Sequence, residues 1–168
     1  MNLSQRLLAE FTTEVVATRR VFDRVPEDQL SWKPHPKSMT LGQLALHIAQ
    51  VPGGVATLIS ESPREVPVFR DGPQAADRAE LHKNLDWSVE TVTRLLTTWG
   101  DNGLKEEWRM ESKGMPILTL PRIEMVRSTV LNHWYHHRGE LMVYLRMLDV
   151  PLPAIYGPSA DEDPFTRA

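Results

Sequence analysis

Hydrophobic residues recur at steps of three and four in four long segments of the chain, a spacing typical of amphipathic helices. In the first segment, residues 3–22, the apolar stripe contains Leu3, Leu7, Phe11, Val15 and Phe22. The second predicted helix begins at Thr40, the third covers residues 75–99, and the fourth covers residues 121–148. Four such helices with long connections predict an all-α fold, a four-helix bundle that forms a single domain over residues 1–168.

The second helix has strong start signals and an ambiguous end. Thr40 and Gln43 have the spacing of a capping box, in which each side chain satisfies a backbone N–H of the other. Pro52 has no N–H to donate to the carbonyl of Ile48, so the helix either ends or kinks there. The sequence leaves both outcomes open.

The connections are marked by proline, glycine and loss of periodicity. Residues 23–39 and 60–74 are rich in proline and predict loops, and Gly100 or Gly103 is the expected stop of the third helix. Residues 104–120, around Gly114, have no helical period and predict a short hairpin or an irregular arm. The tail after Pro151 is expected to lie over the helices.

The amino-acid composition excludes several kinds of functional site. The chain has 168 residues, with 19 Lys and Arg against 22 Asp and Glu, and a net charge of −3 that argues against nucleic-acid binding. It has six His and no Cys, which excludes disulfides, thiolate metal ligands and a cysteine nucleophile. The sequence contains no candidate signal peptide and no stretch of about 20 apolar residues, so we expect no membrane segment and a cytoplasmic protein.

Three histidines lie within predicted apolar stripes. His133 and His137 are one helical turn apart on the fourth helix and point the same way, as in helices that chelate a metal ion. His47 lies in the stripe of the second helix. Three imidazoles in one interior would form a metal site with an open coordination position, typical of catalytic zinc. The alternative is that each is a hydrogen-bonded core histidine, although two facing buried imidazoles without a metal are costly.

The remaining histidines and the residues near the three stripe histidines give weaker evidence for a functional role. His136 lies off the main stripe, and His35 and His82 are expected to be solvated. Glu140 is predicted to orient an imidazole rather than to bind the metal, or to form a solvated ion pair with Arg138. Gly139 predicts a close approach of a neighbouring helix. Gln43 could orient His47, although its capping role is a sufficient explanation.

The sequence resembles the DinB-like (DinB/YfiT) superfamily of four-helix-bundle proteins. Four motifs carry this resemblance in the expected order across most of the chain. They are Trp32-Lys33-Pro34, the segment from Leu41 to His47, the segment His133-Trp134-Tyr135-His136-His137-Arg138-Gly139-Glu140-Leu141, and the segment from Val150 to Ser159. One departure is Glu140, where the family often has Gln.

The resemblance implies a divalent metal ion, usually zinc or nickel, held by His47, His133 and His137. It also implies a homodimer. Characterised relatives include S-transferases that use low-molecular-weight thiols and a mycothiol-dependent maleylpyruvate isomerase. The family shares its name with a translesion polymerase, which this sequence does not resemble.

Three functional hypotheses follow, and the least specific is a purely structural helix bundle without a metal. The first is a metal-dependent enzyme, a transferase or hydrolase, that acts on a small molecule. Because the chain has no Cys, any thiolate would come from a low-molecular-weight thiol cosubstrate. Trp32, His35 and Tyr156 are predicted at the rim of its pocket. The second is a non-catalytic, stress-related module that binds a metal, a ligand or a partner.

Overall fold

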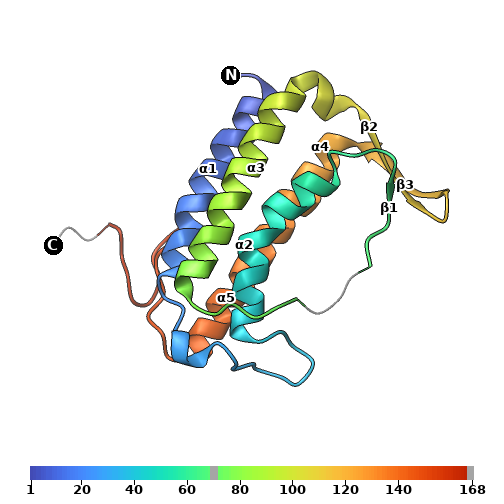
Figure 1. The fold of residues 1–168 in the computed structure, drawn as a ribbon. Helices are drawn as coiled ribbons and strands as arrows, with labels where there is room; N and C mark the ends of the chain where they lie inside the picture. The colour runs from blue at the N-terminus through green and yellow to red at the C-terminus, as the bar shows by residue number, and fades with distance from the viewer. Residues whose placement is uncertain (69–71, 166–168) are drawn as a thin grey trace.

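A computed structural model describes residues 1–68 and 72–165, which are mostly helical (Figure 1). Helix α1 (Leu3–Phe22) packs along α3 (Arg78–Lys105), and α2 (Leu41–Leu58) packs against both α3 and α5 (His133–Met147). A short 3-10 helix, η1 (Glu27–Gln29), lies in the connection between α1 and α2. The predominance of helix expected from the apolar stripes is confirmed.

The expectation of an all-α four-helix bundle is confirmed only in its predominance of helix, because a small sheet lies at one end of the helices (Figure 1). Its order is β1-β2-β3, with a parallel β1–β2 pair and an antiparallel β2–β3 pair. The strands are β1 (Arg64–Glu65), β2 (Glu107–Ser112) and β3 (Met115–Pro121). Of the two alternatives for residues 104–120, the hairpin is therefore confirmed. Its turn contains Lys113 and Gly114, both with positive φ, as two-residue hairpin loops require.

Helix α2 continues through Pro52 as far as Leu58, so the alternative that it ends at Pro52 is wrong. The hydroxyl of Ser88, on α3, donates to the Ala49 carbonyl at 2.7 Å and accepts from the Gly53 N–H at 3.1 Å. It thus bridges the two backbone groups that would pair directly in an unbroken helix. A Cβ on Gly53 would lie 2.9 Å from the Cα of Ser88, so glycine permits this close crossing.

Helix α3 continues past its predicted stop. Gly100 has φ 53° and ψ −166°, which bends the helix, and helical structure resumes as far as Lys105. The start also differs, since Asp77 caps the helix by accepting from the N–H of Glu80 at 2.8 Å. Gly100 is therefore a kink, because glycine can adopt this conformation without strain.

The last predicted helix, residues 121–148, is one helical segment with a different geometry at its centre. Between α4 (Arg122–Met125) and α5 lies a π-helix, η2 (Val126–Asn132). The N–H of His133 donates to Ser128, five residues earlier, instead of to the residue four earlier. A regular α-helix over this stretch was the wrong prediction, and π-turns of this kind are frequent at functional sites.

Arg138 joins α5 to α1 through the interior. It is only 2 % exposed, and its guanidinium donates to the Glu14 carboxylate at 2.5 Å and to the Thr18 hydroxyl at 3.2 Å. The predicted solvated ion pair with Glu140 is therefore wrong, because Arg138 faces α1. The close approach predicted at Gly139 is wrong too, since a Cβ there would meet no atom of another described segment within 4 Å.

The apolar stripes of the helices meet in one core, which includes Phe11, Leu44, Leu85 and Leu141. Across the ranges that the structure describes, none of the helices combines the length and apolarity of a membrane span. Residues 69–71 of the predicted connection and 166–168 of the predicted tail lie outside the described residues.

Candidate metal centre

His47 lies in the second turn of α2, whose start is fixed by its cap. The Thr40 hydroxyl accepts from the N–H of Gln43, and the Gln43 side chain accepts from the N–H of Thr40 at 2.9 Å. The predicted capping box is therefore present. Gln43 also donates to the carbonyl of Gly72 at 3.0 Å, which ties the start of α2 to the segment before α3. His47 follows one turn later and is half-buried.

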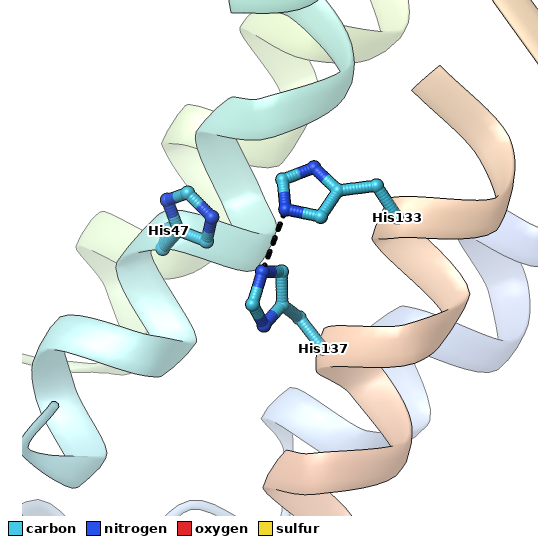
Figure 2. A group of neighbouring side chains, drawn as sticks. All are labelled: His47, His133 and His137. Atoms are coloured by element: carbon cyan, nitrogen blue, oxygen red, sulfur yellow. Dashed lines mark hydrogen bonds between the residues drawn. The ribbon is translucent and has the colours of Figure 1, made fainter. Parts of the chain in front are cut away.

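His133 and His137 extend from α5 toward His47, and the three rings meet between the two helices (Figure 2). The Nε2 atoms of His133 and His137 lie 2.7 Å apart. The ring centroid of His47 is 4.7 Å from that of His137 and 5.6 Å from that of His133. One ligand nitrogen from each ring lies within 4.8 Å of the others. The structure thus brings together the three histidines that the helical stripes selected.

Burial and mutual proximity disfavour a positive charge on His47 and on His133. The pKa of His47 is lowered to about 4, mainly by desolvation and then by the neighbouring His137 and His133. Desolvation, followed by the effect of His137, also lowers the pKa of His133. Neutral imidazoles keep a lone pair for a metal ion, so the low pKa values suit this donor set.

Glu140 contacts the outer nitrogen of His137. Its carboxylate oxygen lies 2.6 Å from Nδ1 of His137, while its other oxygen lies 3.3 Å from Nε2 of His136. A proton on Nδ1 of His137 leaves Nε2 of that ring as the acceptor in the cluster. Since His136, His137 and Glu140 also converge, they form a second, more exposed group that could hold a cation.

One buried nitrogen tests whether a metal fits the triad. If Nε2 of His137 is an acceptor, the hydrogen bond between the two rings requires a proton on Nε2 of His133. Nδ1 of His133 is then an unprotonated, buried nitrogen, and it has no hydrogen-bond partner among the residues that the structure describes. A metal ion that took both Nε2 lone pairs would move this proton to Nδ1, and the Thr129 backbone favours a protonated ring. The donor set therefore fits a metal ion better than it fits three imidazoles alone.

A cavity of about 470 Å³ opens beside His47. Its lining comes from the loop before α2, from the exposed face of α2 and from the segment before α3. The polar lining side chains are Lys33, Lys37, Ser38, Thr40, Gln43, His47 and Gln50. Its volume is within the range of small-molecule sites.

Sequence reasoning missed Lys33, Lys37 and Gln50 as cavity residues. Gln50 could have been found, because it lies three residues after His47 on the same helix face. The two lysines come from a loop, and periodicity carries no information on where loop side chains lie.

The three residues predicted at the rim, Trp32, His35 and Tyr156, are not among the described residues that line this cavity. Trp32 packs edge-on against Tyr144 of α5, with ring centroids 5.6 Å apart, and does not line the cavity beside His47. Tyr156 donates to the Glu14 carboxylate at 2.7 Å and lines two other cavities on the α1 and α5 side. Its pKa is raised, chiefly by desolvation and by the bond to Glu14.

Two other histidines stand apart from the triad. His35 is exposed, and its Nδ1 accepts from the N–H of Lys37 at 3.2 Å. His82 lies 3.0 Å from the carboxylate of Asp23 and packs edge-on against Phe22.

The arrangement can be compared with known proteins. The sequence model of the DinB family matches residues 1–164. This chain belongs to the DinB family. It is also similar to the uncharacterized protein YrdA of Bacillus subtilis (strain 168), with 26% identity over 159 residues that cover 92% of this chain and 89% of YrdA. The family resemblance drawn from the four sequence motifs is thereby confirmed.

Solved structures of DinB-like proteins share the fold. A DinB-like protein from Bacillus cereus ATCC 10987 superposes with a TM-score of 0.70 at 22% identity, covering 89% of this chain and 95% of its own. The DinB-like protein YjoA from Bacillus subtilis gives a TM-score of 0.66 at 20% identity, covering 88% and 95%. These likenesses support the fold of this DinB-family chain.

Proposed function

We propose that this DinB-family protein holds a divalent metal ion, zinc or nickel, through His47, His133 and His137. The observation that carries the proposal is the convergence of the three half-buried imidazoles from two helices, with Nε2 atoms of two rings 2.7 Å apart. Three protein ligands leave a coordination position open, which is the arrangement of catalytic rather than structural sites.

The proposed reaction is a transfer to or from a low-molecular-weight thiol, with hydrolysis as the related alternative. A divalent ion at such a site lowers the pKa of a bound thiol or water, or polarises a carbonyl. Because the chain has no Cys, the thiol must come from a cosubstrate. The chain's own contribution is the cavity beside His47, which admits a small molecule, and Glu140, which holds the orientation of His137.

The proposed partners are small molecules and a second copy of the chain, the latter from the family resemblance alone. The net charge of −3 argues against nucleic-acid binding.

The test is metal content combined with turnover. Protein purified without a His tag should contain close to one metal ion per chain, and His47→Ala should lose it. Turnover in a panel of thiols and electrophiles should disappear in His133→Ala and should not return with added metal. Metal content near zero in the unmodified protein would contradict the proposal. An intact metal site whose removal lowers only the melting temperature would favour a non-catalytic binding module.

A further inference from the structure

Most of the described residues that line the cavity come from a stretch of the chain without acidic residues. No aspartate or glutamate occurs between Asp28 and Glu61, although the whole chain has 22 acidic residues and a net charge of −3. The same stretch contains Lys33 and Lys37 and all of the α2 face that borders the cavity. Its charge is therefore opposite in sign to that of the molecule as a whole.

Both lysines reach the cavity without a carboxylate partner. Among the described residues, neither ammonium group has a carboxylate oxygen within 4.0 Å, and no lining side chain of this cavity is acidic. Lys33 Nζ donates to the Pro36 carbonyl at 3.1 Å, which uses one of its three protons. Two exposed lysines thus border one concave space whose lining also includes His47.

The backbone N–H groups in the first turn of α2 are already hydrogen-bonded and do not compete with the lysines for an anion. The N–H groups of Leu41 and Gly42 donate to the carbonyls of Trp32 and Leu30, at 2.8 Å and 2.9 Å. The N–H of Gln43 donates to the Thr40 hydroxyl at 3.1 Å. Since the first turn of the helix is satisfied internally, an anion in the cavity would be bound by the lysine side chains.

We propose that the cavity binds a small anionic molecule, whose carboxylate or phosphate group lies between Lys33 and Lys37 and whose reactive end points toward His47. A local cationic rim raises the concentration of anions that the net charge of the protein would otherwise repel. The assignment of the reactive end rests on the proposed function, whereas the anion subsite does not.

The first experiment uses metal-free protein in the presence of a chelator. Succinate, inorganic phosphate and the uncharged analogue succinamide are titrated by calorimetry into the unmodified chain and into the double variant Lys33→Gln/Lys37→Gln. The matched control is Lys83→Gln/Lys105→Gln, which removes the same charge from exposed lysines of α3. We expect an anion to bind in preference to succinamide, the cavity variant to bind it about tenfold more weakly, and the control to match the unmodified chain.

Three results would overturn the anion subsite. They are absence of binding by both anions, equal binding of succinate and succinamide, and an equal loss in the two double variants. Whether succinate or phosphate binds more tightly identifies the anionic group. Protection of Lys33 and Lys37 from acetylation by the bound anion, read by mass spectrometry, locates it.

The second experiment separates this inference from the proposed function. Cobalt-loaded protein is titrated with mercaptosuccinate and with 2-mercaptoethanol, and thiolate binding is followed by absorbance. We expect mercaptosuccinate to bind about tenfold more tightly, and this preference to disappear in Lys33→Gln/Lys37→Gln. Failure to bind cobalt or thiol contradicts the proposed function but leaves the succinate result standing. Thiol binding without a preference for the anionic thiol overturns the present inference alone.

Discussion

At the scale of single residues, Glu140 controls which nitrogen of His137 is free. Its carboxylate lies 2.6 Å from Nδ1, so a proton held there directs the Nε2 lone pair toward His133 and His47. Carboxylates in this position typically change metal affinity by 10- to 100-fold. The glutamine common in the family at this position could accept the same proton through its amide oxygen.

We therefore expect Glu140→Ala to lower zinc affinity by about tenfold or more, and Glu140→Gln to lower it less. Competition with a chromogenic chelator measures both affinities. Glu90→Ala, which removes an exposed glutamate from α3, is the matched control and should leave the affinity unchanged. An unchanged affinity in Glu140→Ala would show that the contact does not support the site.

The lowered pKa values of His47 and His133 make the metal-free protein sensitive to acid. The pKa of His47 is about 4 in the folded chain, against 6.5 for an ordinary histidine, and that of His133 is lowered as well. Below pH 6.5 these histidines bind protons in the unfolded chain, whereas in the folded chain they bind them only at lower pH. The free energy of unfolding is therefore highest above pH 6.5, as far as these groups affect it, and decreases as the pH falls toward 4.

For His47 we expect this loss to be about 1–2 kcal/mol, after allowance for its partial exposure to solvent. The measurement is urea unfolding at pH 7, 5.5 and 4.5 in the presence of a chelator. Because carboxylates also titrate in this range, the informative quantity is the difference between the unmodified chain and His47→Asn, whose stability should fall less steeply. Parallel curves for the two proteins would contradict the prediction.

How far single residues can be predicted depends on periodicity. His47, His133 and His137 could be predicted, because their helical spacing alone puts them on interior faces. Arg138 lies on the same helix as two of them, yet its burial depends on Glu14, which is 124 residues away in sequence. No local pattern in the sequence indicates that pairing.

At the scale of elements, Ser88 explains why α2 continues past Pro52. Its hydroxyl bonds both the Ala49 carbonyl and the Gly53 N–H, so it replaces the helical hydrogen bond between them. Ser88 is fully buried, and removal of its hydroxyl leaves these two backbone groups without their partner. The rigidity of this part of α2 matters for the site, because His47 precedes Pro52 by little more than one turn.

We expect Ser88→Ala to lower the free energy of unfolding by about 1–3 kcal/mol. In a Pro52→Ala background the loss should be smaller, since the helix can then close its own backbone bonds. Urea denaturation of the two single variants and the double variant measures this coupling. Equal losses in both backgrounds would mean that Ser88 acts by packing and not through the helix break.

The elements also show where sequence patterns stop being informative. The hairpin was one of two predicted alternatives for residues 104–120, and the Lys113-Gly114 turn gives it a physical basis. The π-helix over residues 126–132 could not be predicted, because its hydrogen-bond shift leaves the apolar spacing compatible with an ordinary helix. The continuation of α2 through Pro52 could not be predicted either, because it depends on the hydroxyl of Ser88 on α3.

At the scale of the whole molecule, the candidate centre joins two helices that are far apart in the sequence. His47 comes from α2 and the other two histidines from α5, so a metal ion bound by all three would cross-link the two helices (Figure 2). Such a ligand binds the folded chain and finds no preformed site in the unfolded one. Binding free energy is thus converted into folding stability.

We expect zinc at about 100 times its Kd to stabilise the protein by about 2.7 kcal/mol, which raises Tm by about 5 to 10 °C for a chain of this size. The measurement is thermal unfolding of tag-free protein with zinc and with chelator. His47→Ala should lose the increase, whereas His35→Ala, which removes an exposed loop histidine, should keep it. If His47→Ala kept the full increase, the ion would bind without α2. The exposed group formed by His136, His137 and Glu140 would then be the better site.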